Sequence, residues 1–318
     1  MLRKVGVITR DCAGVNAALR ALVRTAAGYN LEVSGILKGY DGLIDGHLMP
    51  LDRRAVSGII NLGGTILKSA RSERFLTAAG QQKALKTIRD HGLDGLVVIG
   101  GNGSLSGAHL LAARYGIRVI GIPATIDNDV NGVDFCLGVD TAVNVALDAL
   151  DKIRDTATSL ERIFVVEVMG RDCGYLAMNV ALAGGCEDVL LPELDFSLEE
   201  ICREIEAGNA RGKVSWIVIV AEGRASARDV AAAITGLTGL ETRIAVLGHI
   251  QRGGRPTAFD RILAARLGNA AIESLLQGET DKCLSFKNDS IELVPLETAI
   301  QPKKLKFESE YRLLKLLS

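Results

Sequence analysis

The stretch that decides the fold is GVITRDCAGVNAALR, residues 6–20. Its apolar first half predicts a buried strand, and the small and apolar residues after Gly14 predict a helix. The turn between them offers backbone N–H groups and the positive end of a helix dipole to an anion. A loop that holds phosphate usually has glycines at this turn, whereas here the turn is Arg10-Asp11-Cys12-Ala13. The stretch leaves two hypotheses: an altered phosphate site, or a strand–helix corner without a ligand.

The same alternation of strand and helix continues along the chain. Short apolar runs predict buried strands, and helical patterns lie between most of them. This order predicts an α/β fold with parallel sheets and right-handed crossovers, in which ligands bind at the carboxyl ends of strands. The predicted strands are residues 5–9, 32–37, 95–99, 118–122, 163–168, 188–191, 216–220 and 241–246, and the predicted helices include 81–90, 139–156, 198–210 and 228–235.

The composition limits the class of protein. The chain has 318 residues, 48% of them hydrophobic, which is enough for one large core or two ordinary ones. A net charge of -1 gives no support for binding to nucleic acid or to an anionic membrane. The six cysteines form no CxxC pair, which favours free thiols in a reducing compartment. With no signal peptide and no apolar run of about 20 residues, we expect a cytoplasmic protein that does not enter a membrane.

Two polar loops directly follow predicted strands. GGNGSLSGA, residues 100–108, opens a helix with glycines and a serine, which an ordinary glycine-rich turn also explains. PATIDNDV, residues 123–130, places two carboxylates, a threonine and an asparagine within five positions, and an Asx-rich turn would also contain them. Two carboxylates separated by one residue in a loop can point differently, one toward Mg²⁺ and one toward a substrate hydroxyl.

Cationic and polar residues follow two later strands. MGRDCG, residues 169–174, supplies Arg171, and LGHIQRGGRPTAFDR, residues 247–261, supplies His249 and Arg252. A single arginine is most often solvated, and a single histidine is most often structural. Three such groups just past strand ends are better explained by an anion site.

Four stretches together carry a resemblance to a known family. GGNGS, PATIDND, VVEVMGRDCG and ETRIAVLGHIQRGG resemble the bacterial ATP-dependent 6-phosphofructokinase family, and the similarity continues over essentially the whole chain. The resemblance implies a glycolytic transferase that moves the γ-phosphoryl group of ATP to the 1-hydroxyl of fructose 6-phosphate and forms fructose 1,6-bisphosphate.

The family's architecture is also implied by the resemblance. It predicts two doubly wound α/β domains with parallel sheets and the active site between them. The nucleotide-binding domain would comprise residues 1–138 plus 251–301. The sugar-phosphate-binding domain would comprise residues 139–250 plus 302–318.

The resemblance assigns roles in catalysis. Asp127 would be the general base that takes the proton of the sugar hydroxyl, and Thr125 would position the transferring phosphoryl group. Arg171 would stabilise the charge that shifts in the transition state. Asp129 and Asn102 would hold Mg²⁺. Phosphoryl transfer depends mostly on positioning and charge neutralisation, so these groups suffice without a covalent nucleophile.

The substrate sites follow from the same resemblance. Arg162 and Arg243 would reach the 6-phosphate from a neighbouring subunit, which implies a homotetramer with shared active sites. The remaining sugar-binding residues would be Met169, Gly170, Glu222, His249 and Arg252. The nucleotide-binding residues would be Asp11, Arg71, Gly101, Asn102, Gly103 and Ser104.

A second anion site is implied at a subunit interface, where the family binds ADP or phosphoenolpyruvate as an allosteric effector. Glu187 would contact the Mg²⁺ of ADP. Each cation of the set is by itself also explained as a surface residue, and their joint presence favours the effector site. The matching residues are Arg20, Arg24, Arg53, Arg154, Glu187, Arg211 and Lys213.

The chain also departs from the family pattern. The first loop is two residues shorter than usual and lacks its glycine pair, so we expect a weak hold on ATP that Arg10 restores only in part. Asn102 stands where the family usually has an acidic residue near the metal, which keeps an oxygen ligand but removes a charge.

The resemblance also indicates which phosphoryl donor the protein uses. Pyrophosphate-dependent relatives typically carry Asp in place of Gly103 and Lys in place of Ala124, so the small residues here favour ATP. Two alternatives stay open: a pyrophosphate-dependent enzyme, and a catalytically impaired regulatory paralogue that binds sugar phosphate or effector.

Overall fold

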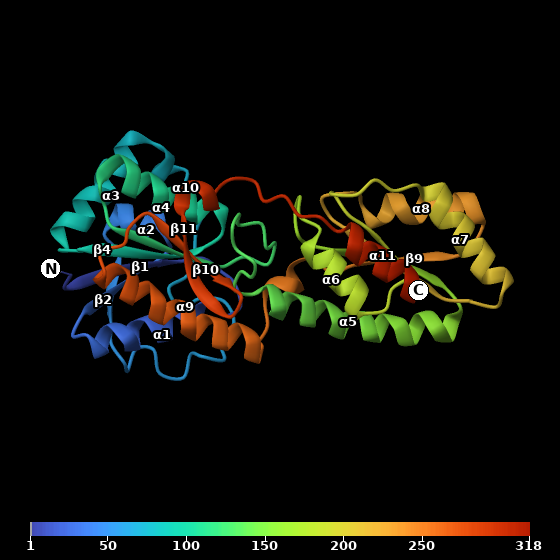
Figure 1. Ribbon diagram of the computed structural model, residues 1–318, viewed down its shortest axis with the longest axis horizontal. Coiled ribbons are helices and arrows are strands. Elements are labelled where there is room, and N and C mark those ends of the chain that lie inside the picture. Colours follow the sequence, from blue (N-terminus) through green and yellow to red (C-terminus); the bar gives the residue numbers. More distant parts are fainter. Residues whose placement is uncertain (1) are drawn as a thin grey trace. The chain divides into compact units, whose positions relative to one another are not determined.

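The computed structural model describes residues 2–318 and divides the chain into two compact units. Unit 1 comprises Met1–Thr141 and Arg252–Lys303, and unit 2 comprises Ala142–Gln251 and Lys304–Ser318. The chain therefore leaves unit 1, returns to it and leaves it again, at positions close to the implied domain boundaries after residues 138, 250 and 301. Each unit is built around its own sheet (Figure 1).

The sheet of unit 1 has the order β11-β10-β5-β4-β1-β2-β3. Its central strands are parallel, as predicted, but β3 pairs antiparallel with β2 and β11 antiparallel with β10. These edge strands were not predicted from the sequence. The turn of the β10–β11 hairpin at Asn288 and Asp289 has positive φ at both residues, a pattern that Asn and Asp tolerate. The strands are β1 (Lys4–Thr9), β2 (Glu32–Ile36), β3 (Leu48–Leu51), β4 (Gly95–Gly100), β5 (Val119–Pro123), β10 (Lys282–Lys287) and β11 (Ser290–Pro295).

Helices cover both faces of this sheet (Figure 1). On one face α1 (Val15–Gly28) packs against α9 (Ala258–Leu276), with close approach at Gly268, where an added Cβ would lie 2.6 Å from the Ala18 carbonyl oxygen. The other helical segments of the unit are α2 (Tyr40–Asp45), η1 (Arg74–Leu76), α3 (Ala78–Asp90), α4 (Asn102–Tyr115) and α10 (Leu296–Ala299).

The sheet of unit 2 has the order β7-β8-β6-β9, and all of its pairings are parallel. Its core contains fully buried residues such as Val165, Ile205, Val218 and Ile234. Helices α7 and α8 lie over one face, and α5 and α6 lie over the other (Figure 1). The elements are α5 (Val139–Leu160), which begins before the unit boundary, β6 (Ile163–Val168), α6 (Tyr175–Ala183), β7 (Asp188–Leu190), α7 (Leu198–Ala210), β8 (Trp216–Ala221), α8 (Ala227–Thr238), β9 (Thr242–Val246), η2 (Gly248–Arg252) and α11 (Glu308–Leu317).

The predicted fold class is confirmed. Every strand predicted from the sequence is present, with its ends displaced by at most one residue. Apolar β-branched runs identify buried strands well because both faces of such a sheet are covered by helices. Among residues 2–318, none of the helices combines the length and the apolar character needed to span a bilayer.

Candidate active site

The unit 1 loops predicted to bind nucleotide and to carry the catalytic aspartate leave the sheet at the same end. Strands β1, β4 and β5 are neighbours, so the corner that contains Asp11 and the loops GGNGS and TIDND all leave the sheet at adjacent carboxyl ends. The Ala124 N–H donates to the Gly100 carbonyl at 3.0 Å. The Cβ of Thr125 lies 3.2 Å from the point where a Cβ on Gly101 would stand. The sheet therefore brings Gly101 and Thr125 together, as their predicted roles require.

The loop that carries Arg71 lies over the same corner. Asn16, which is 1% exposed, accepts a hydrogen bond from Ile66 N–H at 2.9 Å and donates to the Gly63 carbonyl at 3.0 Å. An added Cβ on Gly64 would stand 3.1 Å from Oδ1 of Asp11. Asp11 and Arg71 are both exposed. Asn16 was not predicted from the sequence, where its only signal is a polar residue among small apolar ones in the first turn of a helix.

Arg10 and Cys12 differ in where they point. The Arg10 guanidinium donates from Nη1 to the Ala70 carbonyl at 2.9 Å, so it ties the corner to the residue before Arg71. Cys12 is 2% exposed and donates from Sγ to the Leu137 carbonyl at 3.2 Å. Burial raises the pKa of the Cys12 thiol, which keeps it neutral. Cys12 thus packs beneath the corner, and a phosphate role for the corner stays a prediction.

Asn102 and Asp129, the two predicted metal ligands, lie next to each other. The Asn102 amide donates from Nδ2 to the Asp129 carbonyl at 3.2 Å, which links the two loops. The Oδ1 atoms of both side chains are buried, and neither has a hydrogen-bond partner in the part of the chain that the structure describes. Mg²⁺ is usually held by one or two protein oxygens together with substrate phosphates, so this pair fits a divalent metal. Within residues 2–318 there is no cluster of three or more His, Cys, Asp or Glu residues that would form an all-protein metal site.

Asp127 sits in a buried loop that several hydrogen bonds hold. It is 2% exposed, and its N–H donates to Thr125 Oγ1 at 3.2 Å. The next residue, Asn128, is fully buried and has a φ of 52°, a conformation that Asn tolerates better than most residues. Its side chain donates to the Asp134 carbonyl at 2.9 Å and accepts from Cys136 N–H at 3.0 Å. Asn128 therefore fixes the sharp turn between Asp127 and Asp129.

In unit 2, a tight turn at Met169–Arg171 follows β6. Oε1 of Glu222 accepts from Arg171 N–H at 3.0 Å and from Gly170 N–H at 3.3 Å. Oε1 of Gln251 accepts from Met169 N–H at 2.9 Å. Gly170 has a φ of 137°, which favours glycine. Glu222 and Gln251 thus shape the backbone of the turn, and Gln251 is a residue the sequence analysis did not single out.

Arg162 and Arg243 lie at the opposite end of the same sheet. Arg162 precedes β6, and Arg243 is level with Phe164 near the start of that strand, whereas Met169 follows its end. The advance from Phe164 to Met169 is roughly 17 Å at about 3.3 Å per residue. Both arginines pair with Glu241, Arg162 through Nε at 2.9 Å. Unit 2 therefore does not bring these arginines to the turn after β6 that carries Met169 and Gly170, two of the residues predicted to bind the sugar.

The predicted effector residues fall in both units. In unit 1, Arg20 and Arg24 lie one turn apart on α1, and Arg53 is exposed after β3. In unit 2, Arg154 donates to the Gly185 carbonyl at 3.0 Å.

Glu187 is the acidic member of the set. It is 7% exposed, accepts from Ile217 N–H at 2.6 Å and pairs with Lys213 at 3.1 Å. Both of its oxygens are therefore engaged within the chain.

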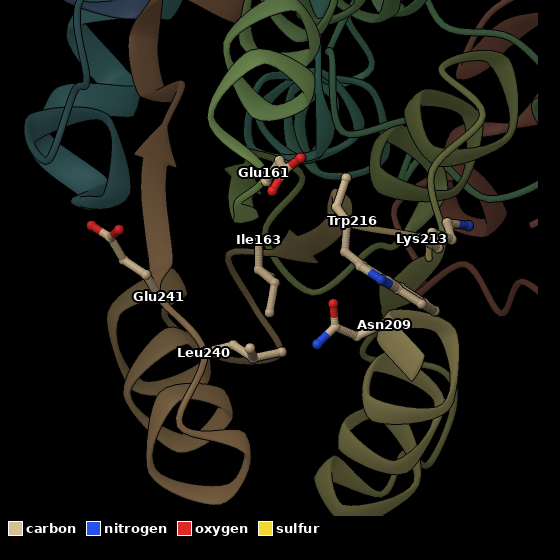
Figure 2. A pocket seen from close by; sticks show the side chains of 8 residues that line it. Glu161, Ile163, Asn209, Lys213, Trp216, Leu240 and Glu241 are labelled. Carbon is tan, nitrogen blue, oxygen red and sulfur yellow. The ribbon is translucent and has the colours of Figure 1, made fainter. Parts of the chain in front are cut away.

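Two hollows adjoin Lys213. A cavity of about 80 Å³ is seen in Figure 2, and it is lined by Glu161, Ile163, Asn209, Lys213, Val214, Trp216, Leu240 and Glu241. A larger hollow of about 510 Å³ is lined by Arg211 and Lys213 with Glu200, Arg203, Glu204, Ala207, Trp216, Lys315 and Ser318. The Lys213 ammonium lies 4.6 Å from the centroid of the Trp216 ring. The only tryptophan of the chain therefore stands beside two of the predicted effector cations.

Comparisons with known proteins show the family to which the chain belongs. Curated relatives that match the chain over the full length of both sequences include the ATP-dependent 6-phosphofructokinases of Halothermothrix orenii, 46% identical over 331 residues, and Thermotoga neapolitana, 47% identical over 319 residues. That of Clostridium tetani is also 47% identical over 319 residues.

Solved structures share the fold. The phosphofructokinase of Saccharomyces cerevisiae superposes with a TM-score of 0.88 at 33% identity, covering 94% of this chain and 45% of the yeast chain. The pyrophosphate-dependent phosphofructokinase of Marinobacter aquaeolei gives a TM-score of 0.85 at 26% identity, covering 96% of this chain and 86% of that one. The phosphofructokinase family model matches residues 4–275. The chain therefore belongs to the phosphofructokinase family.

Proposed function

We propose that this protein is an ATP-dependent 6-phosphofructokinase, which transfers the γ-phosphoryl group of ATP to the 1-hydroxyl of fructose 6-phosphate. The observation that carries the proposal is the TIDND loop, where the buried Asp127 lies two residues from the Asn102–Asp129 oxygen pair. The names of the full-length relatives at 46–47% identity give the same activity.

The chemistry follows from the loop. Asp127 accepts the proton of the attacking hydroxyl, Thr125 positions the transferring group and Arg171 stabilises its charge. Mg²⁺ would be held by Asp129 and Asn102, and it supplies charge neutralisation on the phosphates. Asp11, Arg71, Gly101, Gly103 and Ser104 hold the nucleotide.

The sugar phosphate is held by the turn of unit 2 and its neighbours. Met169, Gly170, Glu222, His249 and Arg252 bind fructose 6-phosphate. Arg162 and Arg243 reach the 6-phosphate of a neighbouring subunit, which is consistent with their place at the far end of the sheet. The enzyme is then a homotetramer with shared sites, and it works in the cytoplasm.

The donor is ATP rather than pyrophosphate. A Cβ on Gly103 would meet no atom within 4 Å, so this position leaves room for a nucleotide. The test supplies the purified protein with fructose 6-phosphate, Mg²⁺ and either ATP or pyrophosphate, and it measures the fructose 1,6-bisphosphate formed. Turnover with pyrophosphate alone would make the protein the pyrophosphate-dependent enzyme. No turnover with either donor, together with binding of fructose 6-phosphate, would make it the regulatory paralogue.

ADP or phosphoenolpyruvate acts as an effector at the cations around Lys213. Trp216 lines both hollows there, so binding should change its fluorescence. Arg211→Ala should weaken that response, whereas Arg228→Ala, on a helix that lines neither hollow, should not. An unchanged spectrum at saturating ADP and phosphoenolpyruvate would contradict the effector site.

A further inference from the structure

The loop that carries Asp127 and Asp129 is hydrogen-bonded along one side to residues 298–303, here called the 298–303 segment. Val130 forms an antiparallel bridge with Pro302. Asn131 N–H donates to the Ala299 carbonyl at 3.1 Å, and its side-chain amide donates to the Thr298 carbonyl at 3.3 Å. A segment some 170 residues later in the chain therefore fixes the loop beside the reacting groups.

Lys303 is the last residue of the 298–303 segment and of unit 1. Its ammonium donates to the Asn128 carbonyl at 2.9 Å and to the Val133 carbonyl at 2.7 Å. The first of these belongs to the peptide that joins Asn128 to Asp129. One cation thus closes the loop across its two ends, and it does so with charge-assisted hydrogen bonds, the stronger kind.

We propose that Lys303 is a positioning residue for phosphoryl transfer: it holds the 128–133 loop so that Asp127 and Asp129 keep their productive geometry. This inference rests on the proposed function for the role of the two aspartates. Lys303 itself touches backbone carbonyls rather than a reacting atom, so it acts through the loop. Displacement of a reacting group by about 1 Å can lower the rate about 100-fold. Loss of the two hydrogen bonds from Lys303 should therefore lower kcat.

The chain offers a matched control. Lys304 is the next residue, carries the same charge and is exposed, whereas Lys303 is half-buried. Lys303→Met removes both hydrogen bonds to the loop while nearly keeping the length of the side chain. Lys304→Met removes an equal charge and leaves those hydrogen bonds in place. Lys303→Arg keeps the charge and the donors, and Lys303→Gln keeps a single donor group in case the methionine variant does not fold.

The experiment measures kcat, both KM values and hydrogen–deuterium exchange of peptides covering residues 125–137. We expect Lys303→Met to lower kcat about 10- to 100-fold, to leave KM for fructose 6-phosphate within about twofold, and to speed exchange at Asn131 and Cys136. Lys303→Arg should restore most of kcat, Lys303→Gln should fall between, and Lys304→Met should match the wild type.

Two results would overturn the proposal. One is an unchanged kcat in a folded Lys303→Met protein. The other is a loss of kcat accompanied by an equal change in KM for fructose 6-phosphate and by faster exchange throughout unit 1, because that pattern shows general destabilisation. If the wild type itself lacks turnover, the proposed function fails, and the exchange data still decide whether Lys303 holds the loop.

Discussion

Arg243 provides a test of whether active sites are shared between subunits. In the sheet of unit 2, Arg243 is level with Phe164, roughly 17 Å along β6 from Met169 at about 3.3 Å per residue. An arginine side chain cannot cross that distance, so it must act on the site of another subunit or not act on substrate. Arg243→Ala should therefore remove a contact to the 6-phosphate of a neighbour.

The expected loss follows from the type of contact. A charge-assisted contact is worth about 1.5–3 kcal/mol, which corresponds to about 10- to 150-fold weaker binding of fructose 6-phosphate. Binding of ATP should be retained, because the residues predicted to bind ATP lie in unit 1. The substitution should disturb the fold little, since Glu241 keeps its pairing with Arg162 at 2.9 Å. Lys152→Ala, which removes an exposed cation of unit 2 paired with Asp148, is the control and should change KM by less than about twofold.

Mixing the Arg243→Ala and Asp127→Asn proteins tests whether Arg243 acts on the active site of a neighbouring subunit. Under shared sites, a site works when its own chain has Asp127 and its neighbour has Arg243. Equal random mixing satisfies both conditions in about one quarter of the sites, so activity should rise above the sum of the two parents. Hybrid tetramers, verified by mass, that show only the summed parental activity would refute the assignment of Arg243 to a neighbouring site.

Three further predictions concern single groups. Asp127→Asn should lower kcat about 10²- to 10⁴-fold while the dissociation constant of fructose 6-phosphate changes little, and a fall in kcat below about fivefold would contradict its role as base. Arg10→Ala should raise KM for ATP and leave KM for fructose 6-phosphate unchanged, because Arg10 ties the corner to the loop before Arg71; a silent substitution would mean that the corner holds no phosphate. The thiols should resist a disulfide reagent at pH 8 until the protein is unfolded, since burial raises the pKa of Cys12 and raises that of Cys186 to about 12. Fast labelling of the native protein would contradict the burial of these thiols. Their pKa values in the folded state lie above the unfolded value of about 8.5, so the unfolded chain loses these protons at lower pH than the folded chain. The free energy of unfolding should therefore fall as pH rises above about 8.5.

The local sequence determined the secondary structure and much of the candidate site. Buried strands are apolar on both faces, so residues 163–168 and their counterparts could be identified without knowledge of their neighbours. Residues that follow parallel strands share one edge of a sheet, so Gly101 and Thr125 could be expected to meet. The edge strand β3 was missed because it has only four residues and contains Pro50. The β10–β11 hairpin was missed because its strands mix apolar residues with lysine, serine and glutamate.

Other features were decided only by tertiary structure. The inward packing of Cys12, the link between Asn102 and Asp129, and the placing of Arg162 and Arg243 far from Met169 depend on strand order and register. Lys303 had no local signal at all, because the carbonyls that it binds lie 175 and 170 residues earlier in the chain. Local propensity acts over a few residues, whereas such contacts form only when packing brings distant segments together. The residue types could therefore indicate the chemistry, but only the fold could show which groups hold the reacting residues in place.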